Sequence, residues 1–172
     1  MMRVEVFPDR EGWLLAEPLD REVYTPEVMA QVPWRDVVWA HADRRVIVSE
    51  NSQILCHAGV FFRDGLYGGD KVRICGVGGV MTSPRARKRG LAGMAMTRAA
   101  ELMQEENIDF GLLFCEEHNV RLYAALGWRL FSGKVHCIQP SGPMIFDVIP
   151  TMTLSINRTP RDGVIDLCGL PW

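Results

Sequence analysis

The spacing of apolar residues predicts strands in the first half of the chain and alternating strands and helices in the second. Residues 3–7 predict an opening strand, and the prolines between residues 8 and 33 predict only short helices after it. Two β-branched apolar runs, 45–49 and 53–62, are separated by a short polar turn, which is the pattern of a hairpin. A third strand is expected at 72–82.

After this strand the apolar residues recur every three or four positions, the period of an amphipathic helix. This pattern predicts a helix from about Arg89 to Glu106. The segments that follow are interpreted as a strand at 108–115, a short helix at 119–126 and strands at 135–138 and 151–156. The alternation predicts an α/β fold, with one mixed sheet flanked by helices in a single domain spanning residues 1–172.

Composition narrows the function without defining it. Apolar residues make up 48% and charged residues 23% of the chain, as in ordinary globular proteins. A net charge of -2 provides no field that attracts nucleic acid, and no apolar run near Met1 is long enough for a signal peptide or a membrane span. Five scattered cysteines indicate reduced thiols in a cytoplasmic protein, and none has the spacing of a metal site.

The clearest chemical signal lies where the strand at 72–82 gives way to the helix. The segment reads Thr82, Ser83, Pro84, Arg85, Ala86, Arg87, Lys88, Arg89, Gly90, Leu91, Ala92, Gly93. The first N–H groups of a helix have no partner within it and attract anions, and small residues let phosphate oxygens approach that backbone. Cations beside it add charge-assisted hydrogen bonds. A diphosphate site is therefore predicted, with a solvated basic surface as the alternative.

This segment resembles the R-x-x-G-x-A loop of the GNAT superfamily of N-acetyltransferases. The run from Leu122 to Trp128 is similar to the L-Y-x-x-x-G-F segment of the same superfamily. The resemblance implies acetyl-coenzyme A as the cofactor, lying in a wedge between the strands that end at Thr82 and Cys115. The cofactor-binding residues that it implies are Val80, Met81, Thr82, Arg87, Lys88, Arg89, Gly90, Leu91, Ala92, Gly93 and Asn119.

The part from Arg45 to Trp172 also resembles aminoglycoside 2'-N-acetyltransferases and, more distantly, nodulation-factor N-acyltransferases. The resemblance is carried by four runs, His57-Ala58-Gly59-Val60, Val77-Gly78-Gly79-Val80, Arg121-Leu122-Tyr123-Ala124 with Gly127-Trp128, and Gly169-Leu170-Pro171-Trp172. In the aminoglycoside enzymes the C-terminal tryptophan folds back so that its carboxylate can meet an amino sugar. Those enzymes have a glutamate, proposed as the general base, where this chain has Gly78, so here the base must lie elsewhere.

The resemblance suggests two catalytic residues and a set of substrate contacts. Tyr123 corresponds to the tyrosine that protonates the departing thiolate, and Glu116 is the first candidate for the proton acceptor. The substrate-binding candidates are Glu116, Glu117, Asp147, Trp172 and Asp36. His57 and His118 are weaker candidates for the base, because a lone histidine in an apolar strand is usually a core residue.

The expected function is direct transfer of an acetyl group from acetyl-coenzyme A to an amine of a cationic amino sugar. The first candidate is the 2'-amine of an aminoglycoside such as kasugamycin, which would confer antibiotic resistance. One alternative is acetylation of another amine, in a polyamine, a peptide or a chitooligosaccharide. A second alternative is a module that binds coenzyme A without catalysis. A homodimer is expected by analogy with the superfamily, and neither nucleic acid nor a membrane is expected as a partner.

Overall fold

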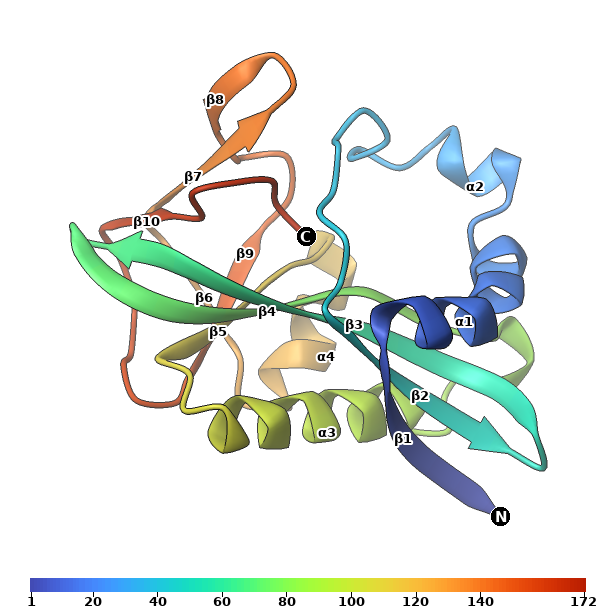
Figure 1. Ribbon diagram of the computed structural model, residues 1–172. Coiled ribbons are helices and arrows are strands. Elements are labelled where there is room, and N and C mark those ends of the chain that lie inside the picture. The colour runs from blue at the N-terminus through green and yellow to red at the C-terminus, as the bar shows by residue number, and fades with distance from the viewer.

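The computed structural model describes all residues from 1 to 172 and contains a ten-stranded mixed sheet with helices on both faces (Figure 1). The strands are β1 (Met2–Pro8), β2 (Arg44–Glu50), β3 (Gln53–Tyr67), β4 (Asp70–Thr82), β5 (Phe110–Phe114), β6 (Arg129–Leu130), β7 (Lys134–Gln139), β8 (Gly142–Ile145), β9 (Thr151–Ser155) and β10 (Val164–Asp166). The helices are α1 (Asp9–Val23), α2 (Pro26–Met29), α3 (Leu91–Glu105) and α4 (Val120–Ala124), with short 3-10 turns at Pro84–Ala86 and Glu117–Asn119. The expected mixed α/β fold is confirmed.

The first four strands form an antiparallel meander, and β5 then adds to β4 in parallel. The other edge of β5 pairs with β9, and β10 pairs with β3 and with β7. The hairpin between β2 and β3 turns at Asn51 and Ser52, whose φ values of 49° and 67° are left-handed. The sequence indicated this hairpin. β6, β8 and β10 are short strands that the apolar pattern did not predict.

The prediction of only short helices before residue 42 was wrong, because α1 runs for 15 residues and includes Pro18. Gly12, Ala16 and Leu19 form a buried stripe on this helix, which packs against β2, β3 and β4. Pro18 itself is exposed and costs the helix one hydrogen bond. Burial of the stripe outweighs that cost. None of the four helices combines the length and apolar character needed to cross a membrane.

The two faces of the sheet carry different layers. α3 packs on one face over a core that includes Ala58, Val77 and Leu113. α1 packs on the other face over Ile47 and Met81. The segment after β10 lies farther along this same face and ends near the middle of the molecule (Figure 1). One face is therefore covered partly by α1 and partly by the end of the chain.

β4 and β5 part at the centre of the sheet. They are paired only from Ile74 to Val77 on β4, and beyond that point β4 remains paired with β3 alone. A bulge at the same place inserts one extra β4 residue opposite β3, with Gly79 at a φ of 58°. The edge of β4 from Gly78 to Thr82 is left without a neighbouring strand on the β5 side. The wedge between these two strands, which the family resemblance implied, is present.

The glycines of β4 accommodate the ring and backbone of Trp172. The indole Nε1 of Trp172 donates a hydrogen bond of 2.9 Å to the Leu112 carbonyl, and the ring stacks on Phe61 at 6.0 Å between centroids. A Cβ at Gly76 would lie 2.0 Å from the Trp172 ring, and a Cβ at Gly78 would lie 2.9 Å from its carbonyl carbon. The glycine-rich strand indicated that something lies against it, and the chain's own tryptophan does so.

We expect Gly76→Ala to destabilise the protein, because the new methyl group needs the space that the Trp172 ring fills. Overpacking of this kind costs about 1–3 kcal/mol of the free energy of unfolding, which urea denaturation measures. The matched control is Gly76→Ala in a Trp172→Ala background, where the methyl group has room. An equal cost in both backgrounds would show that Trp172 is not the reason for this glycine.

Candidate active site

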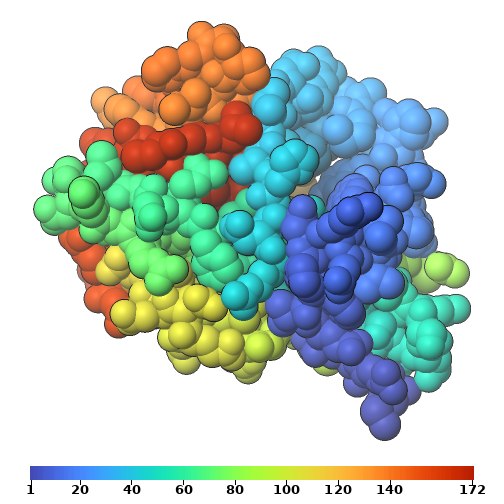
Figure 2. Space-filling model, in the orientation of Figure 1, coloured from blue at the N-terminus to red at the C-terminus, as the bar shows by residue number.

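A cavity of about 460 Å3 lies where α1, the segment after it and the free edge of β4 meet. Figure 2 shows the surface hollowed between α1, in dark blue, and the lighter blue segment that follows. Its walls come from both faces of the sheet. Trp13, Asp20 and Phe61 belong to the α1 face, whereas Cys115 and Tyr123 pack with the α3 core. The cavity therefore passes through the wedge between β4 and β5.

Aromatic rings form much of the wall. The rings that line the cavity are Trp13, Tyr24, Trp34, Trp39, Phe61, Tyr123 and Trp172. Tyr24 and Trp34 meet edge to face at 5.6 Å, and Trp34 and Trp39 meet at 6.0 Å, so these rings brace one another. Packed rings of this kind give a rigid apolar surface whose faces also attract cations.

Two acidic side chains line the cavity, Asp20 from α1 and Glu116 from the end of β5. Both carboxylates lie close enough to Tyr24 to affect its pKa. Burial, and then the charges of Asp20 and Glu116, raise the pKa of Tyr24 to about 12. The pKa of Asp20 itself is raised, because the effect of burial outweighs the opposing charge of the nearby Arg45 guanidinium. The cavity thus combines acidic groups with aromatic walls, which suits an ammonium group.

Tyr123 lies on α4 and reaches the cavity from the wedge. Burial, and then the neighbouring Cys115, Tyr24 and Cys56, raise its pKa well above the ordinary value. The phenol is therefore protonated at neutral pH and can donate a proton but not accept one. Cys115 beside it is buried, which raises the pKa of its thiol to about 11. A thiol that stays protonated is a poor nucleophile.

The loop from β4 to α3 leaves backbone N–H groups free at the helix start. Lys88 and Gly90 adopt left-handed φ values of 62° and 76°, and the first helical hydrogen bond of α3 runs from the Met94 nitrogen to the Gly90 carbonyl. The N–H groups before Met94 therefore have no helical acceptor. A Cβ at Gly90 would meet nothing within 4 Å, so the space in front of the loop is open. These features suit an anionic group such as a diphosphate.

The three cations of this loop differ in their surroundings. Arg89 is held by Glu50 of the β2–β3 hairpin through hydrogen bonds of 3.0 and 2.9 Å. Arg87 and Lys88 are exposed. Arg85, which precedes them, lies 3.4 Å from Glu22 at the end of α1. The charges of Arg87 and Lys88 are thus the ones directed to solvent, while Arg89 also ties the loop to the sheet.

A hydrogen-bonded chain of side chains supports the bulge of β4 from the α1 face. The His57 ring is buried, with Nδ1 2.8 Å from the Gly79 carbonyl oxygen and Nε2 3.1 Å from Nη1 of Arg45. Arg45 forms a salt bridge of 2.7 Å with Asp9 and lies over the Trp13 ring. Burial and the Arg45 charge lower the pKa of His57 to about 4, so the ring is neutral at neutral pH.

Comparison with known protein families identifies the family to which this fold belongs. Residues 19–131 match the model of the acetyltransferase (GNAT) domain, which is more than half of the chain. The chain belongs to the GNAT acetyltransferase family. The expected enzyme class, an N-acetyltransferase, is thereby confirmed. Among curated proteins, none matches the sequence closely enough to be taken as a relative.

Solved GNAT structures share the fold at low sequence identity. A GNAT N-acetyltransferase (YhbS) from Escherichia coli, in complex with CoA, has a TM-score of 0.63 and 14% identity over 98% of this chain and 89% of that chain. A GNAT acetyltransferase from Brucella melitensis, in complex with acetyl-CoA, has a TM-score of 0.58 and 14% identity over 96% and 94%. A GCN5-related N-acetyltransferase from Kribbella flavida has a TM-score of 0.58 and 16% identity over 78% of this chain but only 34% of its own length.

The GNAT domain brings some of the predicted residues together and leaves others apart. The predicted residues that line the cavity are Val80, Glu116, Asn119, Tyr123 and Trp172. Asp36 is exposed beside Arg35, and both Glu117 and Asp147 are exposed away from the cavity. Met81 is buried under α1, and Thr82 approaches the Cys56 sulfur.

The N-terminal third supplies the cavity residues that the sequence analysis missed. These are Trp13, Asp20, Tyr24, Met29, Trp34, Trp39 and Ala40, together with Arg45 at the start of β2. No motif marks them. The only signal was the density of aromatic residues between positions 13 and 39, where the proline spacing drew attention to the helix boundaries instead.

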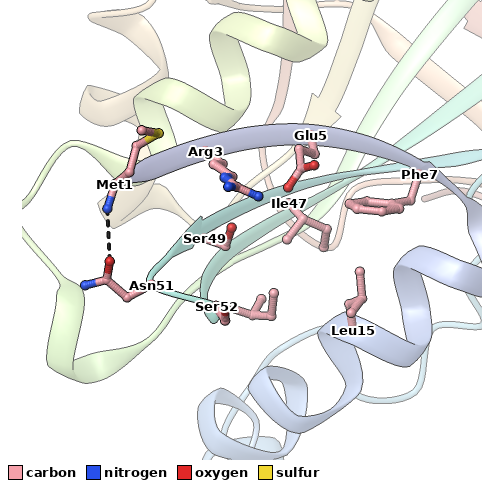
Figure 3. A pocket seen from close by; sticks show the side chains of 10 residues that line it. Met1, Arg3, Glu5, Phe7, Leu15, Ile47, Ser49, Asn51 and Ser52 are labelled. Carbon is pink, nitrogen blue, oxygen red and sulfur yellow. Dashed lines mark hydrogen bonds between the residues drawn. The ribbon is translucent and has the colours of Figure 1, made fainter.

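A second cavity, of about 420 Å3, lies between the β1–β2 ribbon and α1. Phe7, Leu15 and Ile47 make part of its lining apolar, and Arg3 and Glu5 of β1 also line it (Figure 3). The amino group of Met1 is hydrogen-bonded to Asn51 at the end of this groove. It shares no residue with the first cavity, so the GNAT site and this groove are separate features.

The lowered pKa of His57 predicts a pH dependence of stability. Between the ordinary pKa of 6.5 and the folded value of about 4, the unfolded chain binds a proton that the folded chain does not. The free energy of unfolding should therefore fall by about 1.4 kcal/mol for each pH unit from 6.5 down to about 4, and this effect is absent at higher pH.

Urea denaturation at a series of pH values, for the wild type and for His57→Asn, isolates this contribution from the other titrating groups. The charged groups that act on the ring, Asp9 and Arg45, are the same in both proteins. The difference in stability should shrink toward pH 4. Parallel curves would contradict a neutral buried His57.

Proposed function

We propose that this GNAT acetyltransferase transfers the acetyl group of acetyl-coenzyme A directly to the amine of a small cationic acceptor, with an amino sugar as the first candidate. The observation that carries the proposal is one continuous cavity lined by Asp20, Glu116 and aromatic rings on one side and by Tyr123 on the other. An ammonium group and a departing thiolate need these two kinds of partner.

The donor would bind through the loop before α3 and the free edge of β4. The free N–H groups near Gly90, with Arg87 and Lys88, suit the diphosphate. The unpaired backbone from Gly78 to Thr82 suits an extended chain that adds to the sheet edge. When bound, acetyl-coenzyme A supplies the thioester whose acetyl carbon is attacked.

The acceptor would enter from the α1 side. Asp20 and Glu116 attract its ammonium group, and the Trp34 and Trp39 rings offer faces for a cation or for the C–H groups of a sugar. Arg45 also lines this cavity, but its charge is offset by the Asp9 carboxylate at 2.7 Å. The balance of charge at the acceptor side is therefore acidic, which favours a cationic substrate.

In the proposed reaction Glu116 accepts a proton from the amine and Tyr123 donates a proton to the sulfur. The ammonium group loses a proton to the carboxylate of Glu116, with Asp20 as the neighbouring alternative. The free amine then bonds to the acetyl carbon while the carbon–sulfur bond breaks. The phenol of Tyr123, which is protonated at neutral pH, gives its proton to the sulfur. Coenzyme A leaves as a thiol, the remaining extra proton of the amine nitrogen passes to the Tyr123 phenolate and restores the phenol, and Glu116 releases its proton to water.

Direct transfer fits the surroundings of the cysteine at the wedge. A two-step route would need a thiolate on Cys115 to accept the acetyl group first, and burial keeps that thiol protonated. The cavity also reaches both faces of the sheet, so donor and acceptor can be present together. A single ternary complex is the simpler mechanism, and it depends on orientation.

The glycine at position 78 bears on the choice of proton acceptor. The aminoglycoside enzymes have a glutamate at the corresponding position, and here a Cβ would lie 2.9 Å from the Trp172 carbonyl carbon. A glutamate would therefore require Trp172 to move. Glu116 and Asp20 approach the same cavity from β5 and α1, which supports a base in a different position and an acceptor of different shape.

The test of this function is thiol release from acetyl-coenzyme A with a panel of amines. The panel holds kasugamycin and other aminoglycosides, chitooligosaccharides, polyamines and peptides. Turnover with an amino sugar, and a product acetylated on nitrogen by mass spectrometry, would support the proposal. Turnover only with peptides or polyamines would exclude the amino sugar, and tight donor binding with no turnover would favour a non-catalytic module.

With the best amine of the panel, we expect Tyr123→Phe to lower kcat by about a hundredfold, the usual effect of a positioned proton donor. The ring, and therefore the packing of α4, is retained. Affinity for coenzyme A should stay near that of the wild type by calorimetry. An unchanged kcat would remove Tyr123 from the chemistry and leave it as a wall of the cavity.

Gly90→Glu tests the donor site independently of the acceptor. The side chain enters open space in front of the free N–H groups, where its charge repels the diphosphate, and the left-handed φ of 76° adds strain. We expect affinity for coenzyme A to fall by more than tenfold, measured by calorimetry. Gly90→Asn is the matched control, since asparagine tolerates this backbone and carries no charge. Equal affinity in both variants would contradict the loop assignment.

A further inference from the structure

His57 is 1% exposed on the α1 face of the sheet, and its ring contacts the backbone of β4 at the bulge. Arg45 can only donate a hydrogen bond, so Nε2 of His57 must accept one. The carbonyl of Gly79 can only accept, so Nδ1 must carry the hydrogen and donate it. The two neighbours therefore fix one neutral tautomer, and His57 is a donor directed at a single carbonyl.

The direction of that carbonyl determines the direction of the next amide. The Gly79 carbonyl and the Val80 N–H belong to one planar trans peptide, in which they point in opposite directions. With the carbonyl held toward the His57 ring, the Val80 N–H points away from that ring. Val80 lines the cavity, and β4 has no paired neighbour on the β5 side beyond Val77, so this N–H is available to a group bound in the wedge.

We propose that His57 is a positioning residue for catalysis, holding the Gly79–Val80 peptide so that the Val80 N–H can polarise the acetyl carbonyl in the wedge. The proposal rests on the function proposed above. As the amine bonds to the acetyl carbon, the carbonyl oxygen gains negative charge, and a preoriented N–H stabilises that charge. When the carbon–sulfur bond breaks, the electron pair on the oxygen re-forms the carbonyl double bond, the negative charge leaves with the sulfur, and the N–H is unchanged.

The bulge needs such support because a glycine backbone can adopt more than one conformation there. Gly79 has a left-handed φ of 58° and no side chain, so this peptide can rotate more easily than its neighbours. The chain from Asp9 through Arg45 to His57 spans α1, β2 and β3, with contacts of 2.7 and 3.1 Å before the one to Gly79. Three elements of the fold thus hold one peptide in one orientation.

Two amide variants separate the roles of the two ring nitrogens. In His57→Asn the amide nitrogen takes the position of Nδ1 and can still donate to the Gly79 carbonyl. In His57→Gln the longer side chain brings its amide near the position of Nε2, beside Arg45, and the bond to Gly79 is lost. Both variants bury one amide in the same site, so their effects on the free energy of unfolding should be similar.

We expect His57→Gln to lower kcat by about tenfold to a hundredfold relative to His57→Asn, with little change in affinity for coenzyme A. The direct readout is the infrared carbonyl stretch of bound acetyl-coenzyme A labelled with 13C at the carbonyl. In the wild type and in His57→Asn this stretch should lie below that of the free thioester, and in His57→Gln it should return toward the free value. Equal stretches and equal kcat in the two variants would overturn the proposal.

A measurement on the unaltered protein guards against a variant that fails to fold. The Val80 amide proton should shift downfield in the NMR spectrum when acetyl-coenzyme A is bound, relative to coenzyme A alone. The same position in both complexes would overturn the role of this N–H. Neither the infrared nor the NMR readout needs an acceptor, so these tests remain decisive even if the amine panel shows no turnover.

Discussion

The separation of β4 from β5 after Val77 is the constraint on which the rest of this structure depends. Strands that part inside a sheet leave backbone N–H and carbonyl groups without partners, which is costly unless another group binds them. In this protein the unpaired backbone groups of β4 lie where the cavity crosses the sheet. The unpaired edge is the surface that we propose for the donor, and the gap is where groups from opposite faces of the sheet line one cavity.

Two layers on the α1 face border that gap. Trp172 fills the space over Gly76 and Gly78, and its indole is hydrogen-bonded to the Leu112 carbonyl on β5, so it spans the point where the strands begin to part. On the other side of the cavity α1 carries Asp9, the anchor of Arg45. The acceptor side of the site is thus the space left between a helix from the start of the chain and an indole from its other end.

The proposed donor side could be predicted from the sequence because its features are local. A strand end, a run of cations and a glycine that opens α3 are adjacent in the chain, so the loop can be recognised from residues 82 to 93 alone. The acceptor side brings together Asp20, Trp39 and Glu116, which are far apart in sequence and meet only through tertiary packing. The helix through Pro18 was missed for the same reason, since its stability comes from a buried stripe and not from local propensity.

The bulge joins these two sides in one piece of backbone. An extra residue in β4 lets Met81 face α1 on the same side as Gly78, although three positions separate them and regular alternation would put them on opposite faces. That shift buries Met81 under α1 and leaves Gly79 and Val80 between the two faces. A buried neutral histidine is costly to keep in a core unless both of its nitrogens are bonded, and here both are. The histidine that looked like an ordinary core residue in the sequence therefore connects the packing of α1 to the geometry of the wedge.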